Sequence, residues 1–214
     1  MTTIPTVRVR NPRGEGARLR EEILAAADRL LDATRSETEL SLRALAREAG
    51  IAAPSIYQHF ADRHEVVTEL LRRRFDALVA RMQDVLARER GADARGRVHT
   101  VARVYCEFAA ERPAHYRLMF GFAQEAVSLE ELSRHPIQRL LDMFAEVLGP
   151  AIGSDDPERS RLAASSLLAV LHGALSLRYS LPLSIEQPAF TERISRYVDV
   201  VIAGNSAPGG GAPA

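Results

Sequence analysis

A short segment about a quarter of the way along the 214-residue chain carries side chains suited to hydrogen bonding at a surface. The segment AGIAAPSIYQHF, residues 49–60, begins with a turn signal at Gly50. Five residues then follow on one short predicted helix: Pro54, Ser55, Tyr57, Gln58 and His59. Amide and hydroxyl groups on an exposed helix can hydrogen-bond to base edges and to phosphates. The segment therefore predicts a helix that is read against DNA.

The elements around this segment predict a helix-turn-helix. Ser41 is a good N-cap for a helix over residues 42–49, and Gly50 supplies the left-handed backbone that a tight turn needs. A second helix follows over residues 53–60, and small or branched apolar residues would lock the two together: Ala46, Ile51 and Ile56. In such a unit the second helix enters the major groove with its N-terminal residues against the bases.

The same residues carry a family resemblance. The stretch SLRALAREAGIAAPSIYQHFADRHEVV, residues 41–67, closely resembles the DNA-binding domain of the tetracycline-repressor (TetR) family of transcriptional regulators. The preceding helix RLREEILAAADRLLDAT also fits, so the resemblance covers about residues 17–75. Downstream, ERPAHYRLMFG and LLAVLHGALSLR look like a regulatory-domain subtype of this family.

The resemblance implies a role for each of eight DNA-contacting residues. Ser41 would cap its helix and contact a phosphate, and Arg43 would reach a phosphate or a guanine edge. Gln58 would read an adenine, and Arg63 stands where the family usually has a phosphate-binding lysine at the start of the fourth helix. The base-reading tip would hold Pro54 and Ser55, and the further phosphate-contacting positions would be Tyr57 and His59.

Two departures from the family pattern affect base recognition. Ala52 and Ala53 stand where the family more often has a Ser-Lys pair, and Gln58 replaces a usual second aromatic residue. Base recognition should then depend on Arg43, Pro54, Ser55 and Gln58. The sequence does not determine which operator bases are recognised.

The remaining sequence predicts an all-α protein, because it reads as helix after helix without a period-2 strand. We expect a flexible basic arm at residues 1–16, a helix-turn-helix domain at 17–62, a helical regulatory and dimerisation domain at 63–204, and a disordered tail at 205–214. Several helix ends are predicted by local signals. These are a capping box at Asp62 and Glu65, a stop at Gly91, a start at Pro113, a capping box at Ser128 and Glu131, a start at Pro136, a stop at Gly149-Pro150, a start at Asp156-Pro157, and a start at Pro188 or Thr191.

The N-terminal arm carries the strongest charge bias of the chain. The first twenty residues hold five arginines and one acidic residue, although the whole chain has a net charge of zero. Arg8, Arg10 and Arg13 could enter the minor groove of DNA. A solvated tail without DNA contact is the alternative.

One stretch predicts an interface between two copies of the chain. Residues 162–177, LAASSLLAVLHGALSL, contain no charged residue, and a helix that is apolar nearly all round must be covered on all sides. The stretch is too short and too rich in Ser, His and Gly to span a membrane. We expect it to form a homodimer interface with the last helix, residues 190–203. The alternative is a central helix of a monomer.

The regulatory domain has more helix than a dimer interface needs, which suggests a pocket for a small molecule. The predicted ligand is mostly apolar, with one or two polar contacts from His172 and Tyr105. The candidate lining residues are Tyr105, Phe108, Met119, Phe120, Phe122, Met143, Phe144 and His172. Each of these residues could equally be an ordinary residue of the hydrophobic core.

Several function classes are disfavoured by what the sequence lacks. It has no G-x-S-x-G, H-E-x-x-H or phosphate-binding loop, so no enzyme is expected. The histidines lack metal-ligand spacing, so neither metal nor cofactor is expected. The single cysteine, Cys106, and the absence of a secretory signal fit a cytoplasmic protein. The sequence thus predicts a ligand-responsive DNA-binding regulator acting as a repressor on a palindromic operator. The alternatives are an architectural or ligand-independent DNA-binding protein and an all-helical enzyme or carrier.

Overall fold

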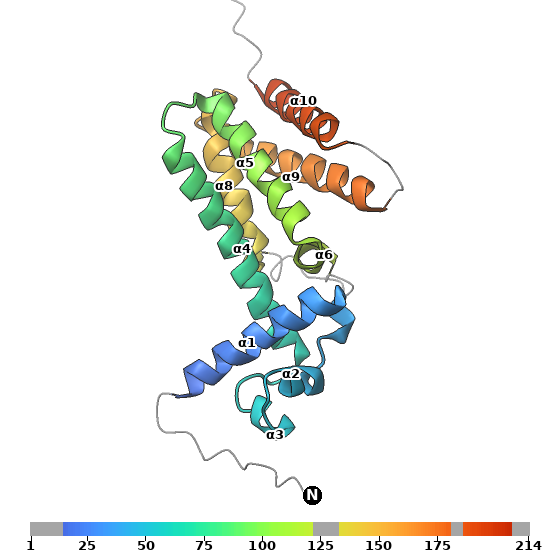
Figure 1. The fold of residues 1–214 in the computed structure, drawn as a ribbon. Helices are drawn as coiled ribbons and strands as arrows, with labels where there is room; N and C mark the ends of the chain where they lie inside the picture. The colour runs from blue at the N-terminus through green and yellow to red at the C-terminus, as the bar shows by residue number, and fades with distance from the viewer. Residues whose placement is uncertain (1–14, 122–132, 181–185, 207–214) are drawn as a thin grey trace, which may run out of the picture. The chain divides into compact units, whose positions relative to one another are not determined.

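The computed structural model describes residues 15–121, 133–180 and 186–206, and these residues form helices and no strand (Figure 1). The all-α prediction is therefore confirmed. Arg8, Arg10, Arg13, Phe122 and the capping box at Ser128 and Glu131 lie outside the described residues. In chain order the elements are α1 Glu15–Thr34, η1 Glu37–Glu39, α2 Leu42–Glu48, α3 Ala53–Ile56, α4 Arg63–Arg88, α5 Ala94–Glu111, α6 Pro113–Gly121, α8 Ile137–Ala151, α9 Pro157–Ser180 and α10 Gln187–Asn205.

The chain divides at Leu70 into two compact units, which are described separately. In the first, α1 packs against α2, and α2 packs against α3 (Figure 1). Apolar side chains from α1, α2, α3 and the start of α4 meet in one core. Its fully buried members include Ile23, Leu31, Leu45, Ile56, Phe60 and Val66. This small core fixes the helix-turn-helix.

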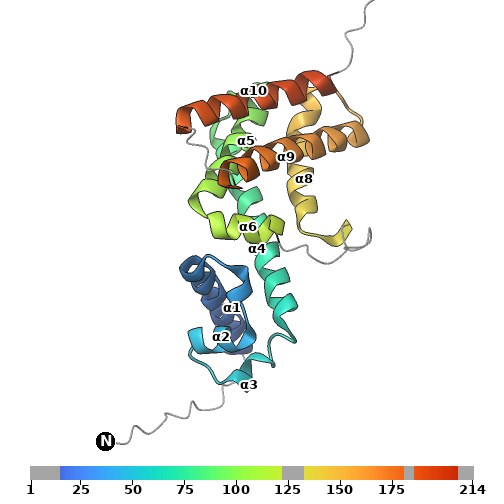
Figure 2. The ribbon, with the colours of Figure 1, turned by 90° about the vertical axis from the view of Figure 1, so that its right-hand side faces the viewer.

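In the second unit, α8 packs against both α5 and α9, and α10 lies across α9 and α5 (Figure 2). The helices α5 and α8 each bury one face. The core residues that they contribute include Val98, Val101, Tyr105, Leu140, Phe144 and Leu148. The last two helices supply Leu167, Leu171, Leu175 and Val198.

A polar cluster holds α10 to α5. The Asp199 carboxylate accepts hydrogen bonds from Arg95 Nε at 3.1 Å and from His99 Nε2 at 2.8 Å. The other ring nitrogen of His99 lies 3.2 Å from Ser195 Oγ. Burial alone would raise the pKa of the Asp199 carboxyl, but the hydrogen bonds from Arg95 and His99 outweigh it and hold the pKa below its usual range.

In the second unit, the predicted stops at Gly91 and at Gly149-Pro150 differ from the helix ends in the structure. The helix α4 ends at Arg88 rather than Gly91, although the Glu89 N–H still donates to the Val85 carbonyl at 3.0 Å. The Glu89 carboxylate accepts hydrogen bonds from two residues of α5, from Thr100 Oγ1 at 2.5 Å and from Arg103 Nη2 at 3.0 Å. The helix α8 continues through Pro150 to Ala151.

Pro150 lies inside α8 and does not stop it, although a proline lacks the N–H that would donate to the carbonyl four residues earlier. The stop comes from Gly153, whose φ is 65°. Ser154 N–H donates to the Gly149 carbonyl at 2.9 Å, and Gly153 N–H donates to the Pro150 carbonyl at 3.3 Å, which is a Schellman motif.

The helix α9 is longer than the uncharged stretch within it. By length and composition alone, residues 157–179 could cross a bilayer, with a mean hydropathy of 1.3. We expected residues 162–177 to be too short for a membrane span, but the length of the whole helix does not exclude one. The core helix of a helical protein meets the same criterion. One face of α9 is buried by the rest of the second unit, and its ends carry Arg159, Arg161 and Arg178.

Candidate nucleic-acid interface and regulatory cluster

The turn between α2 and α3 is fixed by caps at both ends of α2. Ser41 Oγ accepts the Ala44 N–H at 3.2 Å, which confirms the predicted N-cap. At the other end Gly50 has a φ of 67°, and its N–H donates to the Arg47 carbonyl at 3.1 Å. Ile51 N–H donates to the Ala46 carbonyl at 2.9 Å. These two bonds form a Schellman motif, so the turn is set by backbone geometry that favours glycine.

The second helix of the helix-turn-helix, predicted over residues 53–60, is shorter than predicted. The helix α3 ends at Ile56 rather than residue 60. The chain continues in a tighter turn, in which Gln58 and His59 donate their N–H groups to the carbonyls three residues earlier, at 3.3 and 3.0 Å. Phe60 is 1% exposed, and drawing its ring into the core requires the chain to turn here.

The predicted base-reading side chains lie at the surface of this turn. Pro54 and Gln58 are exposed, and Tyr57 is 59% exposed, so Tyr57 is not a core residue. Ser55 and His59 are half-buried. The helix α3 and the turn after it therefore present hydroxyl and amide groups at the surface, while the buried side chains of Ile56 and Phe60 anchor them in the core.

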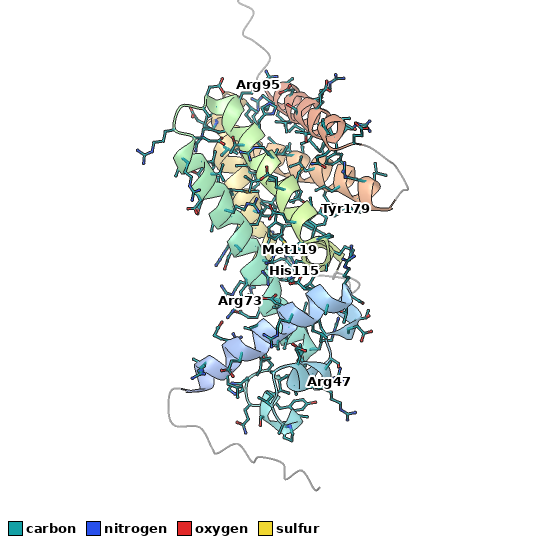
Figure 3. All side chains as sticks on the ribbon, in the orientation of Figure 1. Arg47, Arg73, Arg95, His115, Met119 and Tyr179 are labelled. Atoms are coloured by element: carbon teal, nitrogen blue, oxygen red, sulfur yellow. The ribbon has the colours of Figure 1, made fainter. Side chains whose placement is uncertain are left out.

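The arginines of α1 and α2 have different surroundings. Arg29 Nε donates to Glu48 Oε1 at 2.8 Å, and the Arg20 guanidinium lies 4.6 Å from the centre of the Phe60 ring. Arg43 and Arg47 are exposed one turn apart on α2, and within the described ranges neither has an ion-pair partner. Arg47 extends from α2 into solvent (Figure 3). Sequence reasoning missed Arg47, although its spacing of four from Arg43 places both on one helix face.

The start of α4 is fixed by the predicted capping box. Asp62 Oδ1 accepts the Glu65 N–H at 2.9 Å, and Glu65 Oε2 accepts the Ala61 N–H at 2.8 Å. Arg63, the first residue of α4, is half-buried. Its positive charge lies in the first turn, where helix N–H groups already favour anions such as phosphate.

In the second unit the structure brings together most of the predicted pocket residues. The Phe120 ring lies 4.8 Å from His172 and 6.1 Å from Tyr105, and Tyr105 lies 6.1 Å from Phe144. Phe108, Met119 and Met143 are buried, and Figure 3 marks Met119 on α6. We call Tyr105, Tyr116, Phe120, Phe144 and His172 the aromatic cluster. Tyr116 was missed, because a tyrosine five residues before the glycine that ends its helix carries no distinguishing spacing.

Tyr116 connects the two residues expected to supply polar contacts. Its hydroxyl lies 3.2 Å from the Tyr105 hydroxyl and 2.7 Å from His172 Nδ1, and His172 Nε2 lies 3.3 Å from Ser176 Oγ. Burial raises the pKa of both tyrosines and lowers the pKa of His172. At neutral pH the protonated Tyr105 and Tyr116 hydroxyls, a neutral His172 ring and the Ser176 hydroxyl therefore form one continuous hydrogen-bonded chain.

The helices α9 and α10 leave apolar side chains uncovered. Leu162 is 65% exposed, Leu177 58% and Val200 68%, and Tyr197 of α10 is 36% exposed. Among the described residues, the rest of the second unit covers only one side of the uncharged stretch. Among the described residues no group of three or more His, Cys, Asp or Glu could hold a metal ion.

The first unit thus has the geometry of a helix-turn-helix DNA-binding domain joined to an all-helical domain, which defines a class of transcriptional regulators. Residues 23–70 match the bacterial regulatory proteins of the tetR family, and residues 98–201 match the tetracyclin repressor-like C-terminal domain. The chain belongs to the TetR family of transcriptional regulators, as its sequence predicts. Members of this family are regulators rather than enzymes, and dimerisation and ligand binding are typical of them.

Individual relatives are distant. The chain is 25% identical over 162 residues to the nucleoid occlusion factor SlmA of Vibrio vulnificus, covering 73% of this chain and 82% of that protein. A protein of unknown function from Rhodococcus sp. RHA1 superposes with a TM-score of 0.70 at 26% identity, over 91% of this chain and 98% of that one. A TetR-family transcriptional regulator from Streptomyces coelicolor has a TM-score of 0.64 at 18% identity, over 87% and 98%.

Proposed function

We propose that the protein is a repressor that binds a palindromic operator as a homodimer in the cytoplasm and is released from DNA by a small, mostly apolar molecule. The observation that carries this proposal is the exposed face of the helix-turn-helix. There Tyr57 and Gln58 are presented by a core-anchored turn, and Arg43 has no acidic partner among the described residues. In this role Gln58 and Arg43 read bases, as Pro54 and Ser55 do at the tip. Ser41, Tyr57, His59 and Arg63 contact phosphates.

The homodimer is supported by the uncovered apolar side chains of α9 and α10. Apolar side chains exposed to water, such as Leu162, Leu177 and Val200, are energetically unfavourable unless another surface covers them. In a two-fold dimer the same patch on each copy covers the other. Two reading turns related by this symmetry would meet a palindrome in successive major grooves.

The ligand response is supported by Phe120, the member of the aromatic cluster that contacts Phe75 of α4. The Phe120 ring lies 4.8 Å from His172 and 5.9 Å, edge to face, from Phe75 of α4. A ligand that displaces Phe120 therefore presses on Phe75. Moving a two-state equilibrium from 1:99 to 99:1 takes about 5.5 kcal/mol of differential affinity for the two states.

Ion pairs tie the second-unit part of α4 to its neighbours. Arg81 Nη2 lies 3.3 Å from Glu107 Oε2, and Arg81 Nη1 lies 2.6 Å from Glu111 Oε2, both on α5. Asp76 pairs with Arg139 of α8. Because α4 is one continuous helix from Arg63 to Arg88, a shift of this part is carried to its first turn.

The test is a DNA-binding assay with the full chain and fragments of its own upstream region, followed by addition of a lipophilic compound library. We expect a salt-dependent, sequence-specific shift and at least one compound that both stabilises the protein against heat and releases the DNA. Compounds that stabilise the protein without releasing DNA would contradict the ligand-release mechanism.

A second candidate is a ligand-independent, nucleoid-associated DNA-binding protein. The 25% identity to nucleoid occlusion factors over 162 residues favours it. The same assay separates the two, because such a protein would bind many chromosomal fragments and no compound would release it.

A further inference from the structure

A half-buried arginine, Arg178, directly precedes Tyr179, whose ring lies 6.3 Å from the Tyr116 ring of the aromatic cluster. Arg178 is in the last turn of α9, where its Nη2 donates to Gln187 Oε1 at 3.0 Å and its guanidinium lies 4.4 Å from the centre of the Phe190 ring. Its Nη1 is buried and has no hydrogen-bond partner. Within the described ranges no carboxylate pairs with this guanidinium.

This environment differs from that of three other half-buried arginines of the second unit. Arg81 pairs with two glutamates, Arg161 pairs with Asp142, and Arg159 donates two hydrogen bonds to the Asn205 carbonyl. A guanidinium that is partly removed from water and has no anionic partner has a desolvation cost that no ion pair offsets. The Phe190 ring and the carbonyls at the end of α9 offset part of it. The buried Nη1–H still lacks an acceptor.

The charge of Arg178 acts on the same surroundings as the cluster. Burial raises the pKa of the Cys106 thiol to about 12, and the positive charge of Arg178 opposes this rise. Cys106 directly follows Tyr105 on α5. Tyr179, next to Arg178, has its ring 6.3 Å from that of Tyr116. Figure 3 marks Tyr179 toward the C-terminal end of α9.

The accessible edge of the cluster is apolar. Phe120 and His172 are half-exposed, whereas Tyr105 and Phe144 are fully buried, and Tyr179 is 39% exposed. The hydroxyls of Tyr105 and Tyr116 and both ring nitrogens of His172 already have hydrogen-bond partners within the cluster. An apolar body can therefore lie against these rings, but the cluster itself offers no charge to select an ionic ligand.

We propose that the effector is an amphipathic organic anion whose carboxylate pairs with Arg178 and whose apolar body lies against Phe120, His172 and Tyr179. This inference rests on the proposed ligand response and adds the chemical class of the ligand. A guanidinium pairs with a carboxylate through two parallel hydrogen bonds, which a neutral amide of the same shape cannot match.

The test compares matched pairs of probes on the full chain without DNA. Isothermal titration measures 2-naphthoate against 2-naphthamide and decanoate against decanamide, with the wild type and Arg178→Gln. In the wild type at least one carboxylate should bind at least about tenfold more tightly than its amide. In Arg178→Gln that ratio should fall to about one while amide affinity is unchanged.

Two further variants separate charge recognition from folding. Arg178→Lys keeps the positive charge, so part of the carboxylate preference should remain even if Arg178→Gln does not fold. Arg88→Gln removes an exposed arginine of α4, whose Nη2 lies 3.8 Å from Asp84, and should leave the ratio at its wild-type value.

Three results would overturn the proposal: amides binding as tightly as acids, an unchanged preference in Arg178→Gln, or no binding of any of the four probes. Each is distinguishable from failure of the proposed regulatory function. Operator binding and release by neutral compounds are measured separately on the same preparation.

Discussion

At Tyr116 a single hydroxyl serves two partners on two other helices, Tyr105 of α5 and His172 of α9. Tyr116→Phe keeps the ring and removes this hydroxyl. The Tyr105 hydroxyl and Nδ1 of His172 then lose their partner, which should lower the free energy of unfolding by about 1–3 kcal/mol. Urea unfolding followed by circular dichroism measures the change.

The control is Tyr57→Phe, which makes the same chemical change on a side chain that is 59% exposed. Its effect should lie within about 0.5 kcal/mol of zero. Equal effects of the two variants would mean that the hydroxyl chain through Tyr116 adds nothing to stability.

Gln58 provides the prediction for base recognition, because it is exposed on the turn after α3. If it reads a base, Gln58→Ala should cost about 1–3 kcal/mol of operator binding and relax preference at one position of each half-site. Arg43→Ala should cost a similar amount by the same criterion. Fluorescence anisotropy with operators substituted base by base measures both.

Two comparisons complete this test. Arg63→Ala should weaken binding to all sequences alike and lower the salt slope by about one, because a phosphate contact carries no sequence information. Gln83→Ala, at an exposed position of α4, should change nothing. Unchanged base preference in Gln58→Ala would remove Gln58 from the reading surface.

At the scale of the helices, ends set by local signals could be predicted, and ends set by distant packing could not. Ser41, Gly50 and the Asp62–Glu65 box act through hydrogen bonds within a few residues, so their types and spacing were sufficient. The early end of α3 depends on burial of Phe60 in a core made by three other segments.

The aromatic cluster follows the same rule. Tyr105 of α5 and Phe144 of α8 were among the candidate lining residues predicted from the sequence. The contact of Tyr116 with His172 joins residues 56 positions apart, and no local pattern marks such a pair. Arg178 was likewise not predicted as a site residue, because the lack of a hydrogen-bond partner for its Nη1 is a property of its surroundings in three dimensions.

The attachment of α10 to α5 should depend on pH through Asp199. The folded pKa of this carboxyl lies below its ordinary value, so its contribution to stability is complete above the unfolded pKa of about 3.9 and is lost as the pH falls through the folded value. Asp199→Asn should lower the Tm at pH 7 and reduce the further loss of Tm on acidification below about pH 4. Thermal unfolding between pH 7 and 3 measures both effects.

The matched control is Glu192→Gln, which removes an exposed carboxylate of α10 that pairs with Arg196 one turn away. An exposed pair of this kind contributes little to stability, so its pH profile should follow the wild type. An Asp199→Asn profile parallel to the wild type at low pH would show that this carboxylate does not couple α10 docking to protonation.

At the scale of the whole molecule, the two sides of α9 have opposite surroundings. Leu167, Leu171 and Leu175 are buried within the second unit, while Leu162 and Leu177 are exposed. A sequence that is uncharged on both sides suits a helix with its own fold on one side and a second copy on the other. Periodicity alone could not separate the two faces, since both are apolar.

The last prediction tests this second copy. A charge placed at an apolar position that is already exposed leaves the folded chain nearly unchanged but is buried when two copies meet, and a buried unpaired charge is strongly unfavourable. Leu162→Glu and Val200→Glu, at positions 65% and 68% exposed, should therefore give folded monomers at micromolar concentration. Because a monomer carries one reading turn, operator affinity should fall by about 10²–10⁴-fold. Light scattering, circular dichroism and anisotropy measure mass, helix content and affinity, with Ala87→Glu on the exposed side of α4 as the control. Dimers of wild-type mass in both variants would place the interface elsewhere on the surface.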